Sequence, residues 1–212
     1  YNSRNSKSRA CGGTEAEMKI CVFGASSADI DDSYIAAGEE LGGLIAGGGH
    51  TLVFGAGADG MMGAAARGAK KAGGGIVGVV PGFFDVDGII FDGCTELLRP
   101  DTMRERKRIM EDMADAFIVT AGGIGTFEEF FEILTLRQLG RHTKPIVVLN
   151  TNGYYDSMDD MLEKAVTAGF MTAACKRLYK TVEKCADAID YIENYVPEEY
   201  NILDVRKIRL EK

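Results

Sequence analysis

Long apolar runs and an excess of positive charge are both missing from this sequence of 212 residues. No run approaches the roughly 20 apolar residues that a membrane-spanning helix needs, so we expect no membrane partner. With 32 acidic and 24 basic residues the formal net charge is −8, whereas binding of nucleic acid polymers requires a basic face. A small anionic ligand stays compatible with this charge, because a loop of backbone N–H groups and a few cations suffice to hold one.

Paired cysteines are also missing. The sequence has five cysteines and no CxxC pair: Cys11, Cys21, Cys94, Cys175 and Cys185. This pattern excludes a dense disulfide framework and argues against a zinc site. His50 and His142 are isolated and belong to no His/Cys/Asp cluster, so we expect neither a metal nor a cofactor. Reduced thiols are typical of a cytoplasmic protein, which is the location we expect.

The first 17 residues are polar and small and lack the apolar stretch of a secretory signal. We interpret residues 1–17 as a disordered leader or an expression remnant, and residues 197–212 as a charged tail. Residues 18–196 are then expected to form one domain, because two full domains would be difficult to build from a chain of this length.

Glycine is abundant: 27 residues, about twice its average usage of roughly 7%. The glycines cluster where short apolar runs end. Such runs, at 18–24, 51–54, 76–80, 94–99, 116–120, 145–149 and 178–182, alternate with helical patterns at 32–47, 60–72, 103–114, 127–139, 154–168 and 185–195. This alternation predicts an α/β fold: a doubly wound, Rossmann-like parallel sheet with helices on both faces. Ligands in such folds bind at the carboxyl ends of the strands.

A GxGxxG fingerprint, Gly55-Ala-Gly57-Ala-Asp-Gly60, follows the second expected strand. A dinucleotide site normally places this fingerprint after the first strand and needs an acid at the end of the next one, about 20 positions on. Here that strand ends in Pro81-Gly82, and the first acid is Asp85. We therefore expect the glycines to bring backbone close to a mononucleotide instead.

The strand at 116–120 runs directly into a glycine loop and a helix. The loop consists of Gly122, Gly123, Ile124, Gly125 and Thr126. Glycines let successive N–H groups converge, and the following helix adds the positive end of its dipole, so the segment is suited to phosphate. A plain tight turn between strand and helix is the alternative.

Glu129 and Arg106 each have a structural and a functional interpretation. Thr126-x-x-Glu129 fits a capping box, in which the glutamate only returns a hydrogen bond to the helix start, and Glu128 would then be a solvated or dipole-complementing charge. Arg106 shares a helical face with Met103, Met110 and Met113, where a charge needs an acidic partner or a ligand. Arg104 and Arg108 lie off that face and are expected to be solvated.

Met103-x-x-Arg106-Lys107 followed by Gly122-Gly123-x-Gly125-Thr126-x-x-Glu129 resembles the paired signature of the LONELY GUY family of cytokinin-activating phosphoribohydrolases, which are often mislabelled as possible lysine decarboxylases. The resemblance runs from about Met18 to Phe170. Further matches are Gly24-Ala-Ser26-Ser27, residues 57–63, Gln138-Leu-Gly140, Lys144-Pro145 and Asn152-Gly153-Tyr154-Tyr155. The sequence departs from the family pattern at Ala121, where proline is usual, and at Gly88, where a glutamate is frequent and only Asp85 and Asp87 are near.

The resemblance implies hydrolysis of the N-glycosidic bond of AMP, usually N6-substituted, to a free base and ribose 5-phosphate. It implies that Arg106 and Glu129 are the catalytic pair. It also implies contacts to the nucleotide from Lys107, residues 122–126, Phe127, Glu128 and Thr135, with Ser26, Ser27, Gly57, Gly60, Met62 and Gly63 as secondary candidates. A homodimer is implied as well, and the chemistry suggests a carboxylate near C1′ with the arginine orienting the substrate.

A non-catalytic nucleotide or cofactor carrier on the same fold is the alternative function. The decarboxylase label is set aside, because no lysine stands in a recognisable pyridoxal-phosphate setting.

Overall fold

The structure is a computed structural model that describes residues 16–84 and 88–198. Most of the expected leader, most of the expected tail, and Asp85 and Asp87 lie outside the described residues. Within them, no helix has the length and apolar character needed to cross a bilayer.

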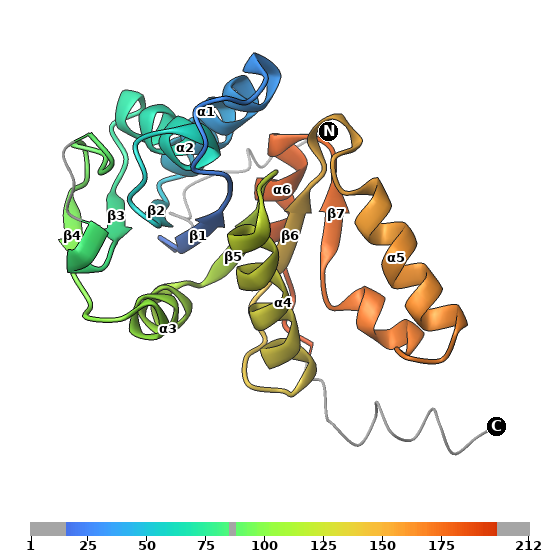
Figure 1. Cartoon of the computed structure of the whole chain (residues 1–212). Coiled ribbons are helices and arrows are strands. Elements are labelled where there is room, and N and C mark those ends of the chain that lie inside the picture. The colour runs from blue at the N-terminus through green and yellow to red at the C-terminus, as the bar shows by residue number, and fades with distance from the viewer. Residues whose placement is uncertain (1–15, 85–87, 199–212) are drawn as a thin grey trace, which may run out of the picture.

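Seven parallel strands form one sheet, as the alternating pattern predicts (Figure 1). The strands are β1 (Lys19–Phe23), β2 (Thr51–Phe54), β3 (Ile76–Val79), β4 (Glu96–Leu98), β5 (Ala116–Val119), β6 (Ile146–Leu149) and β7 (Lys180–Val182). Their order is β4-β3-β2-β1-β5-β6-β7. The five inner strands are buried along nearly their whole length, because helices cover both faces of the sheet.

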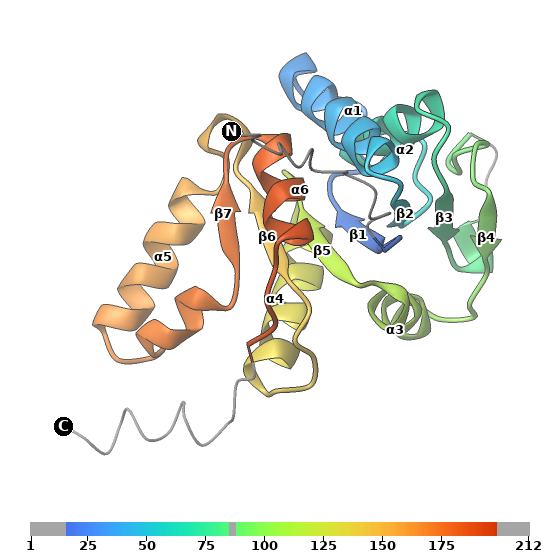
Figure 2. The same ribbon diagram turned by 180° about the vertical axis from the view of Figure 1, so that it is seen from behind.

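Six α-helices divide between the two faces. They are α1 (Asp32–Gly47), α2 (Gly60–Lys71), α3 (Met103–Met113), α4 (Ile124–Gln138), α5 (Asp156–Thr167) and α6 (Cys185–Glu193), with short 3-10 segments at Gly82–Phe84, Thr151–Gly153 and Ala173–Arg177. Side chains of α1, α2 and α6 share one apolar core with the sheet, and side chains of α3, α4 and α5 share the other. The views from opposite sides in Figures 1 and 2 show the same two layers of helices. The doubly wound, Rossmann-like fold is thus confirmed.

Close packing of α1 on α2 depends on glycines. A Cβ on Gly42 would overlap the carbonyl of Ala65, and a Cβ on Gly68 would overlap the carbonyl of Glu39. Bare glycine faces therefore let the two helices approach backbone to backbone on the half of the sheet that contains β1 to β3.

The chain changes direction between β1 and β5. From β1 it proceeds outwards through β2, β3 and β4, and it then returns to place β5 on the other side of β1. The connections leaving β1 and β5 therefore diverge to opposite faces, which opens a crevice at the carboxyl ends of these strands. This is where the expected phosphate loop lies.

Candidate functional site

A pocket of about 530 Å³ occupies this crevice. Its lining is formed by the segments that follow β1, β2, β3 and β5, together with one side chain from α2 and two from α3. The lining residues are Gly24, Ala25, Ser26, Ser27, Gly55, Ala56, Gly57, Met62, Val80, Pro81, Phe84, Ile89, Ile90, Met103, Arg106, Gly123, Ile124, Gly125, Thr126 and Glu129. Its size is ordinary for a small-molecule site.

The β5–α4 loop brings a helix N-terminus to the pocket. Helix α4 begins at Ile124, three residues before the start expected from the sequence, with Gly123 at the N-cap and no side chain capping it. Ile124 is 87% exposed, so the first turn lacks the apolar periodicity that marks a buried helix. The first N–H groups of a helix have no partners inside it and lie at the positive end of its dipole. Gly123 and Gly125 thus belong to the start of the helix itself.

The early start of α4 removes the capping-box interpretation. Thr126 lies within the first turn of the helix, not at its N-cap, and Glu129 lies beyond that turn. The Glu129 carboxylate instead accepts a hydrogen bond from Arg106, with Nη1 and Oε1 3.0 Å apart. Glu129 is therefore not a helix cap.

Arg106 and Glu129 form a buried ion pair at the floor of the pocket. Their side chains are only 10% and 12% exposed. Arg106 also donates from Nε to the carbonyl of Val79 at the end of β3, over 3.0 Å. A Cβ on Gly55 would overlap Nη2 of Arg106, so the glycine after β2 makes room for the guanidinium. The structure thus joins the two residues that the sequence separates by 23 positions.

Burial raises the pKa of Glu129 above its ordinary value of 4.5, while the positive charge and hydrogen bond of Arg106 act in the opposite direction. The burial effect exceeds that of the arginine. A carboxylate in this state is a stronger base than one on the surface, and it is held within a partly apolar pocket.

Lys107 points away from the pocket towards α4. Its ammonium forms ion pairs with Glu128 and, over 2.8 Å, with Glu132. Neither Lys107 nor Glu128 lines the pocket. Arg104 and Arg108 are exposed on α3, as expected.

The remaining predicted residues divide between wall and framework. Ser26, Ser27, Gly57 and Met62 line the pocket, whereas Gly60 and Gly63 do not. Gly60 has a φ of +60°, and a Cβ there would overlap the carbonyl of Ala25. A Cβ on Gly63 would overlap the carbonyl of Ala58, so both glycines serve close backbone packing, Gly60 against the loop after β1 and Gly63 against the loop after β2.

Three residues predicted from the resemblance lie behind or beyond the wall. Gly122 is buried behind Gly123, and Phe127 is partly buried and packs against the core beside Tyr155. Thr135 is exposed on α4, and 11 residues of helix place it about 16 Å from Ile124. None of the three lines the pocket.

Two features of the site were not assigned from the sequence. An apolar wall includes Phe84, Ile89 and Met103, each more than 40% exposed. The hydroxyls of Tyr154 and Tyr155 donate to the carbonyls of Gly122 and Thr120, over 2.6 Å and 2.7 Å. The sequence signal for the tyrosines was the segment 152–155, which matched the family pattern without an assigned role.

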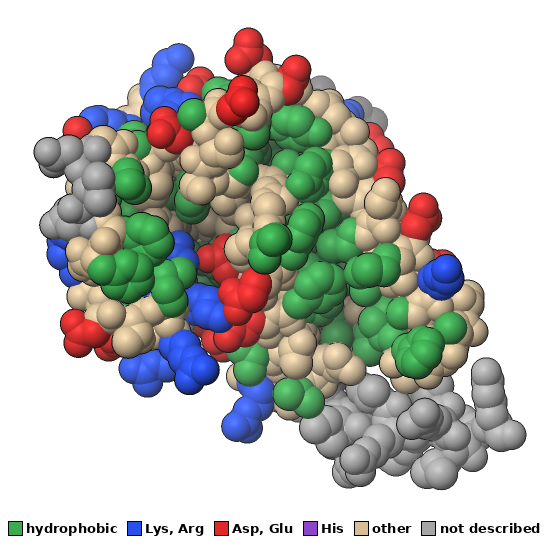
Figure 3. Space-filling view, viewed as in Figure 1, with side chains coloured by type: hydrophobic (Ala, Val, Ile, Leu, Met, Phe, Trp, Pro, Cys, Tyr) green, Lys and Arg blue, Asp and Glu red, His purple; other side chains and the backbone are tan. Residues whose placement is uncertain are grey.

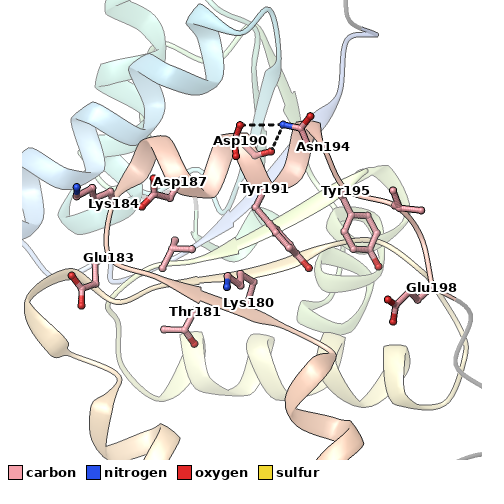
Figure 4. A pocket seen from close by; sticks show the side chains of 12 residues that line it. Lys180, Thr181, Glu183, Lys184, Asp187, Asp190, Tyr191, Asn194, Tyr195 and Glu198 are labelled. Atoms are coloured by element: carbon pink, nitrogen blue, oxygen red, sulfur yellow. Dashed lines mark hydrogen bonds between the residues drawn. The ribbon is translucent and has the colours of Figure 1, made fainter.

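A second pocket, of about 720 Å³, lies on α6, β7 and the residues after α6 (Figure 4). It combines acids such as Asp187 and Asp190 with Lys180 and Lys184, and no residue predicted for the site lines it. The smaller of these two pockets is the candidate site, because it joins the helix N-terminus to the Arg106–Glu129 pair.

The family model described as "Possible lysine decarboxylase" matches residues 62–192. None of the described residues that line the site is a lysine, the residue that a pyridoxal-phosphate enzyme uses to hold its cofactor.

Similar proteins and solved structures also match most of this chain. Cytokinin riboside 5′-monophosphate phosphoribohydrolase LOG2 of Arabidopsis thaliana is 35% identical over 85% of this chain and 84% of its own. A probable enzyme of the same name from Oryza sativa, LOGL5, is 37% identical over 84% of this chain and 73% of its own. The Moco carrier protein of Chlamydomonas reinhardtii has a TM-score of 0.63 at 28% identity, over 84% of this chain and 96% of its own. The chain belongs to the LONELY GUY family of cytokinin riboside 5′-monophosphate phosphoribohydrolases.

Proposed function

We propose that this protein hydrolyses the N-glycosidic bond of AMP or N6-substituted AMP and releases the free base and ribose 5-phosphate. The observation that carries the proposal is the buried Arg106–Glu129 pair, 3.0 Å apart, in a pocket that also contains a helix N-terminus. The names of the relatives support the same reaction.

The 5′-phosphate fits the start of α4. Gly123, Ile124, Gly125 and Thr126 all line the pocket there. N–H groups at a helix start and the helix dipole favour an anion at this place. Lys107 is already paired with two glutamates, so the backbone, with Arg106 nearby, supplies most of the positive potential.

Glu129 then acts at C1′. As the C1′–N9 bond breaks, its electron pair leaves with the base and positive charge develops on the ribose. The ionised carboxylate stabilises that charge and accepts a proton from the attacking water, whose oxygen bonds to C1′. The base takes up one proton and Glu129 gives up the proton that it accepted, so the sum of the reaction is the addition of one water molecule.

Arg106 orients the reaction without exchanging protons. Its pKa exceeds about 12, so it remains charged throughout. Held by the carbonyl of Val79, it positions the Glu129 carboxylate and keeps a positive charge beside the phosphate end of the pocket.

The base fits the apolar side of the pocket. Phe84, Ile89 and Met103 contribute apolar lining to the pocket, and Met62 adds a flexible side chain. Removing an apolar N6 substituent from water against this wall favours binding by about 25 cal/mol per Å² of buried area. We therefore expect an isopentenyl group to be accepted.

The direct test is incubation with AMP and with isopentenyl-AMP, with the free base and ribose 5-phosphate measured separately. We expect both products in a one-to-one ratio and a higher kcat/KM for isopentenyl-AMP. Absence of both products with either nucleotide would refute the reaction.

The likeness to the Moco carrier protein keeps a non-catalytic carrier as the second candidate. The buried acid–arginine pair favours the hydrolase, because binding without turnover does not require a carboxylate that accepts a proton beside the ligand. Tight binding of the nucleotide without release of base would support the carrier.

We also propose that the protein is a homodimer. Hydrophobic side chains gather over α4 and α5 in Figure 3. Ile124 of α4, Met161 of α5 and Phe170 after α5 are 87%, 53% and 90% exposed. Exposed apolar patches of this kind mark interaction surfaces.

A further inference from the structure

Every backbone carbonyl from Thr120 to Gly123 accepts a hydrogen bond. Tyr155 donates from its hydroxyl to Thr120 over 2.7 Å, and Tyr154 donates to Gly122 over 2.6 Å. The N–H of Ala25 donates to the Ala121 carbonyl over 3.0 Å, and the Gly123 carbonyl accepts the N–H of Phe127 over 3.0 Å. Three of these four donors come from outside the β5–α4 segment.

Fixing a carbonyl also fixes the N–H group of the next residue. In a trans peptide the C=O of one residue and the N–H of the next belong to one plane and point in opposite directions. The described residues contain no cis peptide bond. When Tyr154 holds the Gly122 carbonyl, the N–H of Gly123 must point away from that tyrosine. Gly123 lines the pocket and Tyr154 does not.

Both tyrosines are themselves held. Tyr154 contacts Tyr34 of α1 edge to face, with ring centroids 6.0 Å apart, and Asn152 donates to Ser33 over 2.8 Å. Tyr155 is buried, and its N–H donates to the side chain of Asn150 over 2.7 Å. Burial raises the pKa of the Tyr155 hydroxyl, so it stays protonated and can donate.

We propose that Tyr154 and Tyr155 are positioning residues for phosphate binding: their hydroxyls fix the peptide planes at the end of β5 so that the N–H of Gly123 faces the phosphate. The inference rests on the proposed function only in that the β5–α4 loop binds the phosphate. Two consecutive glycines leave these planes mobile, and Ala121 lacks the fixed φ that proline would supply. The two hydroxyls restrict these planes through their contacts with the carbonyls of Gly122 and Thr120.

The test is calorimetric binding of ribose 5-phosphate and of adenine to the full chain and to Tyr154→Phe. Loss of one positioning hydrogen bond is expected to raise the dissociation constant of ribose 5-phosphate by about fivefold to tenfold. The dissociation constant of adenine should change by less than about twofold, because adenine has no phosphate. In turnover of AMP, KM should rise while kcat stays nearly constant.

Tyr179→Phe is the matched control. It removes a hydroxyl from the same helical layer, where Tyr179 donates to Asp159 over 2.8 Å, and should leave both affinities unchanged. Tyr155→Phe should also weaken ribose 5-phosphate, with thermal denaturation confirming that the variant folds.

Equal affinity of the parent and Tyr154→Phe for ribose 5-phosphate, or equal weakening of ribose 5-phosphate and adenine, would overturn the inference. A parent without affinity for ribose 5-phosphate would overturn it as well. A parent that binds ribose 5-phosphate but releases no base would refute the hydrolase proposal and leave the positioning role intact.

Discussion

At the scale of single residues, the site depends on a glycine that makes room for an arginine. A Cβ on Gly55 would overlap the guanidinium of Arg106, which is held by Val79 and Glu129. Gly55→Ala should displace the guanidinium from Val79 and Glu129, which also lowers stability because a buried ion pair is separated. Misplacement near the reacting atoms is expected to lower kcat/KM by about tenfold to a hundredfold.

Steady-state kinetics and thermal denaturation together check this prediction. Gly82→Ala is the control, because a Cβ on Gly82 meets no atom within 4 Å. Full activity of Gly55→Ala would show that the position of Arg106 is unimportant.

The pKa of Glu129 predicts a pH dependence. Burial raises this pKa above 4.5, and the proposed base works only when ionised. Lowering the pH protonates Glu129, so kcat should fall with a midpoint above 4.5. The measurement is kcat at saturating nucleotide over the pH range in which the melting temperature is constant, because kcat reports groups of the complex. A kcat that stays level down to pH 4.5 would contradict the assignment.

At the scale of elements, alanine substitutions at two adjacent glycines of α1 should change the free energy of unfolding in opposite directions. Gly42 faces α2, and a Cβ there would overlap the backbone of Ala65, whereas a Cβ on Gly43 meets no atom within 4 Å. Gly42→Ala should destabilise the protein by about 2 kcal/mol through forced separation of the helices. Gly43→Ala should stabilise it by about 0.5–1 kcal/mol, since alanine favours a helix interior.

Denaturant unfolding of both variants at one protein concentration gives the two free energies. Similar values for the pair would mean that α1 and α2 do not pack through Gly42.

The helices and strands were predictable where their period was regular. The inner strands are apolar throughout and α1 has an amphipathic repeat, so their limits follow from the sequence. The start of α4 was not predictable in this way, because Ile124 and Gly125 are exposed and carry no periodic signal. Thr126 and Glu129 then imitate a capping box that does not form.

At the scale of the whole molecule, the site depends on packing between distant segments. The Arg106 face of α3 was predictable from helical spacing, but its contact with Glu129 requires α3 and α4 to lie on the same face of the sheet. The pairing of Lys107 with Glu128 and Glu132 likewise depends on that packing, and so does the support from Tyr154. A sequence indicates which residues share a face and leaves open which faces meet.

The proposed dimer makes a separate prediction at this scale. Met161→Asp combined with Phe170→Asp places charges on the exposed apolar face of α5 and the turn after it, and should convert a dimer to a monomer. Val196→Asp, which changes a 76% exposed residue after α6, is the control. Molar masses from light scattering distinguish the outcomes, and a parent protein of monomer mass would refute the dimer.

We propose that Glu129 is the carboxylate that drives hydrolysis. Glu129→Gln keeps an oxygen that can accept from Arg106 but removes the charge, and Glu132→Gln makes the same change on the same helix outside the pocket. The most direct measurement is the rate of base release from isopentenyl-AMP by the parent and both variants. We predict a loss of about a hundredfold or more in kcat for Glu129→Gln and nearly parental kcat for Glu132→Gln. Parental kcat in Glu129→Gln would show that this carboxylate does not act in the reaction.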